Sequence, residues 1–236
     1  MPIFAMAKIW HLSFFFLILP INTIPKMTQR IFYIIFMLLC AVGCKPSATM
    51  VIRGTAPAEC EGLNVYLVPQ PYPKAEQVDS TIIRDGRFEF KVDASQVRMS
   101  DITISRKSSV PFQRLLVVVE QGELDVVIDE VSSSRGTPLN DALNEWKLVM
   151  SEAGNQAEIL RQMIALQSDA AVVDSLKAEM EQAYVEAERR TVEIIENNLN
   201  PMGGFLYMVA GRRLDSVTRQ HLIDLGIEKW KPKREN

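Results

Sequence analysis

Residues 79–90 read DSTIIRDGRFEF, and this stretch decides the fold of the region around it. Asp85-Gly86 separates two apolar runs, and a two-residue turn of this composition favours the positive φ angles of a type I′ hairpin. Beyond the turn, Phe88 and Phe90 alternate with charged residues, which is typical of a strand with one buried and one solvated face. The stretch therefore predicts two antiparallel strands joined by a tight turn.

The same pattern extends over residues 49–131, where short β-branched and aromatic runs alternate with turn residues. Gln121-Gly122 separates the runs at 115–120 and 124–129 and predicts a second hairpin. The segment has room for about seven short strands, the number typical of a small sandwich. We expect residues 45–131 to form an antiparallel β-sandwich or barrel.

From residue 132 onward the spacing of the apolar residues changes from two to three or four. Thr137 is a helix-capping residue, and Pro138 suits the first helical position. Apolar stripes at 139–163 and 173–198 predict an antiparallel helical hairpin that turns near residues 167–169. Shorter helices are expected at 205–210 and 215–225. The predicted fold class is α+β, with the helical region at 132–228 and a loose tail at 229–236.

The first 44 residues differ in composition from the rest of the chain. They hold three basic and no acidic side chains, so 23 basic and 29 acidic side chains leave residues 45–236 with a formal charge of −6. From Met27, a single arginine, an apolar run and small residues follow in the order of a secretory signal. Ala41-Val42-Gly43-Cys44 resembles the lipobox of bacterial lipoproteins. That resemblance implies cleavage before Cys44, lipidation of Cys44 and a membrane anchor; an uncleaved membrane helix is the alternative.

Residues 1–26 contain a further apolar run, which a signal does not need. We expect Met27 to be the true start and residues 1–26 to be misassigned; a hairpin of two membrane segments is the alternative. Lys45 stands where retention in the inner membrane usually requires Asp, and no acidic run follows Cys44. The expected location is therefore the cell envelope, as an outer-membrane lipoprotein facing the periplasm.

Composition excludes several classes of function. Three Cys and two His exclude a multi-cysteine zinc module and a disulfide-dense scaffold. A net charge of −3 argues against non-specific binding to nucleic acid, which needs a basic surface. Neither the phosphate-binding pattern G-x-x-x-x-G-K-[ST] nor the nucleophile pattern G-x-S-x-G occurs. We expect no catalytic residue, cofactor or metal.

Individual candidates have plain structural interpretations. Cys60 lies between two glutamates, which disfavour a thiolate, so we expect a structural cysteine. His221 has Ser216 and Asp224 nearby in sequence, but proximity in sequence makes no triad, and we expect a solvent-facing histidine. The carboxylates of residues 179–196 alternate with basic residues, as on a solvated helix face.

Residues 79–90, together with the later run Gly136-Thr137-Pro138-Leu139-Asn140-Asp141, resemble the domain of unknown function DUF4369. In that family the domain stands at the amino-terminal end of Bacteroidota lipoproteins, before a helical spacer and a thioredoxin-like thiol-disulfide domain. The resemblance covers residues 49–200 and implies a β domain followed by helices. Redox activity does not transfer, because residues 45–236 contain no C-x-x-C pair and Cys60 is their single thiol.

The sequence thus favours a membrane-anchored, non-enzymatic binding or interaction module, with envelope proteins or a second copy as partners. The alternative is an accessory or shortened relative of a thiol-disulfide system, with a separate thioredoxin-like protein docked on the helices. A carbohydrate- or small-ligand-binding module would need an exposed aromatic platform. Tyr66, Tyr72 and Trp146 are the candidates for such a platform, and core packing is their other interpretation. A shortened product without activity is a further possibility.

Overall fold

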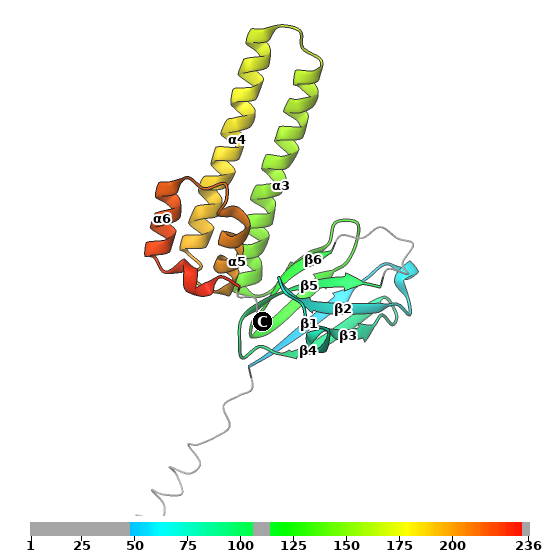
Figure 1. The fold of residues 1–236 in the computed structure, drawn as a ribbon. Coiled ribbons are helices and arrows are strands. Elements are labelled where there is room, and N and C mark those ends of the chain that lie inside the picture. The colour runs from blue at the N-terminus through cyan, green and yellow to red at the C-terminus, as the bar shows by residue number, and fades with distance from the viewer. Residues whose placement is uncertain (1–47, 106–113, 233–236) are drawn as a thin grey trace, which may run out of the picture. The chain divides into compact units, whose positions relative to one another are not determined.

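The computed structural model describes residues 48–105 and 114–232, and Cys44 with its signal segment lies outside these ranges. In these two ranges, eight strands form two four-stranded sheets, in the orders β4-β1-β7-β8 and β3-β2-β5-β6 (Figure 1). The strands are β1 (Thr49–Thr55), β2 (Asn64–Pro69), β3 (Asp79–Ile82), β4 (Arg87–Asp93), β5 (Arg98–Ile104), β6 (Leu115–Val119), β7 (Gly122–Val127) and β8 (Ser133–Arg135).

One hydrophobic core lies between the two sheets. Ile52 of β1 and Leu124 of β7 come from the first sheet, Leu67 of β2 and Ile102 of β5 come from the second, and all four belong to the same buried cluster. β4 alternates strictly between exposed and buried residues, as its sequence predicts, with Phe88 contributing to the core. The α+β class and a sandwich of two sheets are confirmed.

The turn at Asp85-Gly86 has the predicted geometry. Both residues have positive φ, 53° and 67°, and the backbones of Arg84 and Arg87 exchange hydrogen bonds of 2.9 and 3.0 Å. Glu61 holds the turn from outside, because its carboxylate accepts from the amides of Asp85 and Gly86 at 3.1 and 3.0 Å. The predicted pairing of the flanking strands is wrong beyond the bridge between Arg84 and Arg87, since β3 belongs to one sheet and β4 to the other.

The second predicted hairpin is wrong. The turn before Gly122 joins β6 to β7, which lie in different sheets. β7 pairs in parallel with β1, so the first sheet is mixed and not purely antiparallel. Alternation of apolar residues shows which face of a strand is buried but not which strand lies beside it, and this is why the sequence misassigned the pair. β8 was missed because it has three residues and no apolar pattern.

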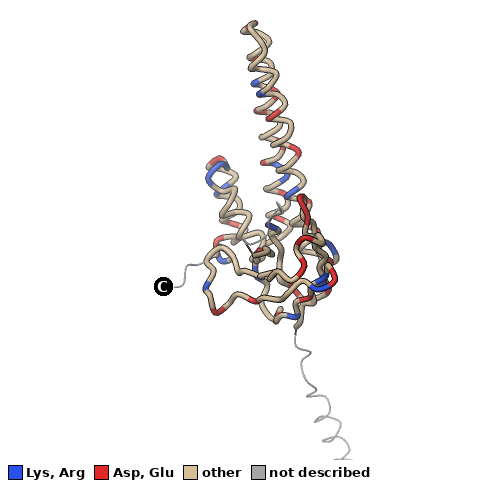
Figure 2. Tube along the Cα trace, turned by 90° about the vertical axis from the view of Figure 1, so that its right-hand side faces the viewer, with Lys and Arg blue, Asp and Glu red and all other residues tan. Residues whose placement is uncertain are grey.

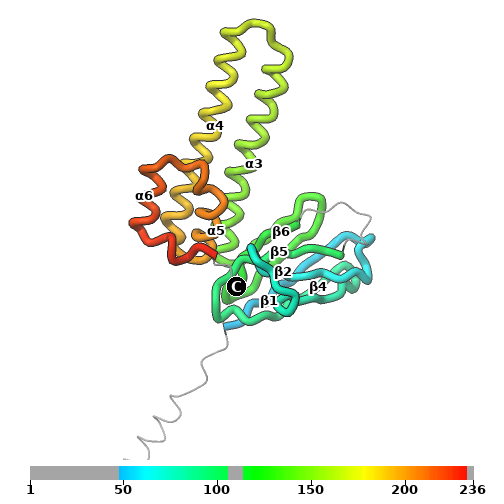
Figure 3. The backbone as a smooth tube through the Cα atoms, in the orientation of Figure 1, coloured from blue at the N-terminus to red at the C-terminus, as the bar shows by residue number. Residues whose placement is uncertain are grey.

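After β8, the described part of the chain contains four α-helices: α3 (Pro138–Ala165), α4 (Ala170–Glu196), α5 (Pro201–Ala210) and α6 (Ser216–Asp224). α3 and α4 run side by side as the predicted hairpin (Figures 1 and 3), with Val149, Ala153 and Ala187 buried between them. The side chain of Asp169 caps α4 by accepting from the amide of Ala171. Within the described ranges, no helix combines the length and apolar character that crossing a membrane requires.

The prediction of a loose tail at 229–236 is wrong for residues 229 and 230. Lys229 and Trp230 belong to a 3₁₀ helix, η4 (Ile227–Trp230), that lies against α5. The contact depends on Gly204, where an added Cβ would come within 2.2 Å of the Trp230 carbonyl oxygen. The lysine-rich sequence of this segment does not predict the contact, because the packing uses the backbone of Trp230 and a glycine more than twenty residues earlier in the chain.

Candidate functional site

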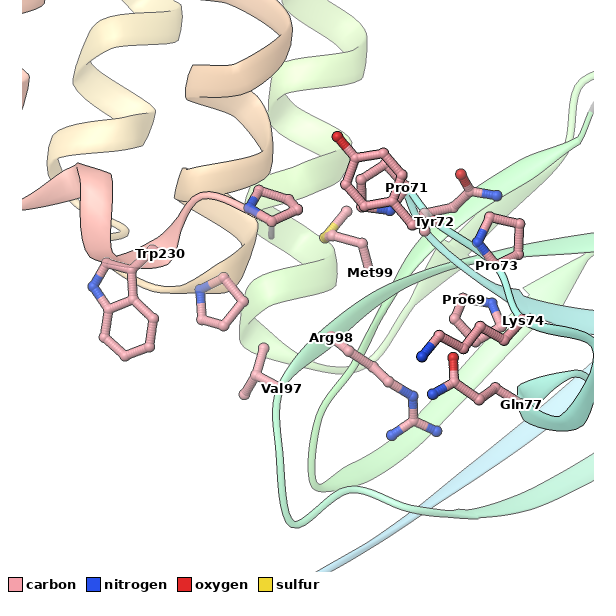
Figure 4. Close-up of a pocket in the computed structure, with 13 residues that line it drawn as sticks. Pro69, Pro71, Tyr72, Pro73, Lys74, Gln77, Val97, Arg98, Met99 and Trp230 are labelled. Atoms are coloured by element: carbon pink, nitrogen blue, oxygen red, sulfur yellow. The ribbon is translucent and has the colours of Figure 1, made fainter. Parts of the chain in front are cut away.

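A groove of about 570 Å³ lies where the β-sandwich meets the helical part (Figure 4). Its walls come from the loop after β2, the start of β5, the start of α5 and the segment around η4. Five prolines contribute to the lining, namely Pro69, Pro71, Pro73, Pro201 and Pro232. The volume falls within the range of roughly 300–1,000 Å³ that is typical of ligand pockets.

Local structure fixes the groove's position. The β2–β5 ladder extends one residue into the loop, because the amide of Gln70 donates to the carbonyl of Met99 at 3.0 Å. Pro201 begins α5, whose next two amides donate to the side chain of Asn200. Proline fixes φ, so walls built from proline lose little conformational freedom when a ligand binds.

The electrostatics of the groove are one-sided. Lys74 and Arg98 are the charged residues among its described lining, and no Asp or Glu lines it. Arg98 Nη1 donates to the carbonyl of Asp93 at 2.8 Å, which leaves other guanidinium donors for a ligand. In Figure 4 the side chains of Lys74, Gln77 and Arg98 gather on one side of the groove, while Trp230 stands on the other.

Three other concave regions of the described part contrast with this groove, because each is lined by carboxylates. The region between α3, α4 and α5 has Glu181 and Glu188, and the opposite groove of the helical hairpin has Glu152, Glu179 and Glu186. The shallow region on the first sheet has Glu89 and Asp125. The other three regions also have arginines in their linings, so the groove differs from them in having cations without carboxylates.

A second cluster of chemical interest lies buried under α3. Asp101, on β5, is 3% exposed, and Arg114 Nε lies 3.2 Å from its carboxylate. Lys147, on α3, donates to the carbonyl of Leu116 at 2.6 Å. Burial lowers the pKa of Lys147 to about 8, although the charge of Asp101 opposes the shift. Burial also raises the pKa of Asp101, against the opposing effect of Arg114 and Lys147.

This cluster belongs to a row of polar contacts, which we call the α3 seam, that ties α3 to the edge strand β6. The fully buried side chain of Asn140 accepts from the amide of Val118 at 2.9 Å and donates to the carbonyl of the same residue at 2.7 Å. The carboxylate of Glu120 accepts from the amides of Leu139 and Asn140 and so completes the helix start. The seam thus satisfies backbone groups that an edge strand would otherwise expose.

The structure separates the sequence candidates for catalysis. Cys60 is fully buried in the sandwich core. His221 is exposed, as predicted, and its Nε2 lies 2.9 Å from a carboxylate oxygen of Glu196, a residue far from it in sequence. Asp224 instead accepts from Gln220 on its own helix. Ser216, His221 and Asp224 therefore do not form a Ser-His-Asp triad.

The proposed aromatic platform does not form. Tyr66 lies in β2, the exposed Tyr72 lines the groove, and Trp146 packs against the buried cluster of the helical part. The carboxylates of α4 match their interpretation as a solvated face, with Glu186 and Glu193 both paired to Arg189. Figure 2 shows charges of both signs along this hairpin. Within the described residues, no group of three potential metal ligands comes together.

The groove and the seam were not predicted from the sequence. Lys74, Arg98 and Trp230 are far apart in sequence, and the turn residues within 49–131 predict loops but not what lies beside each loop. Asp101 had a usable signal, since a carboxylate within a strand of otherwise apolar and small residues implies a buried partner. The lipidation site predicted at Cys44 lies outside the described residues.

A comparison with known protein families found a match for the part of the chain that contains the β-sandwich. The family model described as "Domain of unknown function (DUF4369)" matches residues 50–143. The match begins at the second residue of β1, includes the other described strands and ends in the first turns of α3, so it contains Asn140 but not Lys147. No curated protein and no solved structure matches the chain.

Proposed function

Since residues 50–143 form a DUF4369 domain, we propose that this chain is a membrane-anchored lipoprotein whose folded part is a non-enzymatic binding module. The observation that carries the proposal is the groove between the sandwich and the helical part, in which rigid prolines and two aromatic side chains adjoin two cations. Such a surface offers recognition groups without the pairing of nucleophile and base that catalysis requires. The partner we propose is another protein of the cell envelope.

The positions of the polar groups support binding over catalysis. The thiol of Cys60 lies in the sandwich core, away from the groove lining. The carboxylate of Asp101 faces Arg114 and Lys147 under α3. Lys147 is engaged with the backbone of β6 and contributes to holding the helix. These groups serve the fold.

The proposed anchor is the lipidated Cys44, at the outer membrane and facing the periplasm. Its support is the sequence Ala41-Val42-Gly43-Cys44 after an apolar run. β1 begins at Thr49, so four residues, 45–48, separate the anchor from the sandwich, and Thr49 is the fifth residue after Cys44. An extended chain of that length spans at most about 18 Å, which would hold the module close to the membrane surface. One acyl chain gives marginal binding, whereas several give stable attachment.

The anchor is tested by intact-mass analysis and fractionation of the native protein. We expect a chain that begins at Cys44 and carries acyl mass, and we expect the Cys44→Ala variant to leave the membrane fraction. A Cys44→Ala protein that is still cleaved and still partitions with membranes would refute the lipoprotein proposal.

The binding role is tested by placing a photo-crosslinking residue at Tyr72 in cells. Val127 is the matched control, because both side chains are 46% exposed and Val127 lies on the outer face of the first sheet. We expect a discrete adduct from position 72 that is absent from position 127, and direct binding of the purified partner identified by mass spectrometry. Equal labelling from both positions would contradict the proposal. An adduct with a thioredoxin-like protein from Leu166, at the end of α3, would favour the redox-accessory alternative.

A further inference from the structure

We propose that the groove binds an extended peptide segment that carries carboxylates, supplied by the partner protein. The inference rests on the proposed function and gives the chemistry of what that function binds. It follows from three properties of the groove: the sign of its charge, the nature of its walls and the acceptors that it lacks.

The charge of the lining favours an anionic ligand. Lys74 and Arg98 approach the groove from different elements, the loop after β2 and the start of β5. The segment around η4 adds Lys229, whose ammonium lies 5.1 Å from the centre of the Trp230 ring. It also adds Lys231, whose charge is offset by Glu228 at 3.2 Å. Although the protein is acidic overall, no carboxylate stands among the described lining residues of this groove to repel an anion.

The walls favour a peptide. Val97, Met99 and the proline rings give apolar surface that aliphatic or proline side chains can cover. Tyr72 is 46% exposed and offers a further ring face on the same side as Pro71 and Pro73 (Figure 4). A peptide can present apolar and acidic side chains in alternation, which matches a lining that combines apolar side chains with charged groups at one side.

The missing acceptors disfavour a neutral saccharide. Sugar hydroxyls act as donors, and carboxylates are strong acceptors for them. No carboxylate lines the groove, and the amide oxygens of Gln70 and Gln77 are its side-chain carbonyl acceptors. The indole N–H of Trp230 is itself buried without a hydrogen-bond acceptor in the described part of the chain, so it is not presented to a ligand.

The test uses the full mature protein in detergent and fluorescence anisotropy with defined probes. The acidic probe is a fluorescein-labelled peptide of four Glu-Pro-Leu repeats, and the matched probe has Lys in place of Glu. We expect the acidic peptide to bind at least about tenfold more tightly than the basic one, and its affinity to fall as NaCl rises from low to physiological concentration.

The variant that tests the site is the double substitution Lys74→Gln/Arg98→Gln. Its control is Lys91→Gln/Arg135→Gln, which makes the same change in net charge at exposed positions on the first sheet. We expect the first variant to lose about tenfold in affinity and the second to lose less than about twofold. Thermal unfolding of each variant establishes that both remain folded, and Arg98→Lys provides a conservative check that keeps the charge.

Several outcomes would overturn the inference: equal binding of the two peptides, an acidic peptide unaffected by the groove variant, or tighter binding of polygalacturonate than of the acidic peptide. Its failure is distinguishable from failure of the proposed function. If the adduct from position 72 persists in Lys74→Gln/Arg98→Gln cells, the binding role stands and the acidic ligand is wrong. If that adduct is abolished by the groove variant and competed by the acidic peptide, both are supported.

Discussion

At the scale of single residues, Glu61 has a structural role that its neighbours in the sequence do not predict. Beside Cys60 it suggested an electrostatic effect on the thiol, yet its carboxylate binds the amides of Asp85 and Gly86, more than twenty residues later. It thus does for a tight turn what a capping side chain does for a helix start. The turn has the right residues for its backbone angles, and Glu61 adds a contact from outside the local sequence.

We predict that Glu61→Ala lowers the free energy of unfolding by about 1 kcal/mol, because two amide donors lose a charged acceptor. Equilibrium unfolding in urea measures the change. Glu59→Ala is the control, since Glu59 is exposed on the other side of Cys60, and it should have little effect. Equal losses from the two substitutions would show that the turn does not depend on Glu61.

At the scale of elements, the α3 seam joins a helix to the edge of a sheet. Asn140 imitates a strand residue, because its side-chain amide both donates to and accepts from the backbone of Val118. Lys147 and Asn144 continue the same row of contacts toward Leu116 and Ser134. The helix therefore protects β6 from pairing with another chain.

We predict that Asn140→Ala costs about 2–4 kcal/mol of stability, since it leaves buried donor and acceptor groups of Val118 without partners. Asn155→Ala, at an exposed position of the same helix, should change stability by less than about 0.5 kcal/mol. Urea unfolding measures both, and an Asn140→Ala protein as stable as its control would refute the role of the seam.

Two glycines in helices predict opposite responses to alanine. At Gly204 the new Cβ would lie 2.2 Å from the Trp230 carbonyl oxygen, so Gly204→Ala should displace η4 from α5 and destabilise by about 1–3 kcal/mol. At Gly154, in α3, nothing lies within 4 Å, and Gly154→Ala should stabilise by about 0.5–1 kcal/mol. Differential scanning calorimetry of the two variants gives the sign directly. A Gly204→Ala protein with an unchanged or higher melting temperature would contradict the packing of η4.

At the scale of the whole molecule, the buried charges under α3 couple the sandwich to the helical part. Lys147 comes from the helices, whereas Asp101 and Arg114 come from the sheet, and these are the charged groups that face one another there. Asp101 is buried whereas Arg114 is exposed, so this ion pair contributes little net stability, but an arrangement that separates them would leave a buried carboxylate without its counter-charges.

We predict that the burial of Lys147 makes the stability of the protein depend on pH in the alkaline range. Its pKa is about 8 in the folded protein and 10.5 in the unfolded chain, so between these values the unfolded chain binds more protons. The free energy of unfolding should therefore rise between about pH 8 and pH 10.5, by on the order of 2–3 kcal/mol at most.

Urea unfolding as a function of pH measures this dependence. Lys147→Met should remove the rise, whereas Lys177→Met, at an exposed position of α4, should retain it. A Lys147→Met protein with the wild-type pH profile would show that another group is responsible.

The sequence by itself determined the features that depend on nearest neighbours. The positive φ angles at Asp85-Gly86, the alternation through Phe88 and Phe90, and the proline that begins α3 all follow from local stereochemistry, and so does the order of strands followed by helices. Thr137 stands at the predicted cap position, but its side chain makes no capping hydrogen bond, and the carboxylate of Glu120 accepts from the first amides of α3 instead. The limits of α3 and α4 were predicted to within a few residues because their apolar stripes are long and regular.

Only the tertiary structure decided which elements meet. It separated β6 from β7, placed β7 beside β1, brought η4 to Gly204 and assembled the groove from four separate segments. Burial of an apolar face is satisfied by any complementary face, so periodicity leaves the choice of partner open. That choice depends on shape and on polar contacts such as those of Asn140 and Glu61, which join residues about twenty positions apart and leave no periodic signal in the sequence.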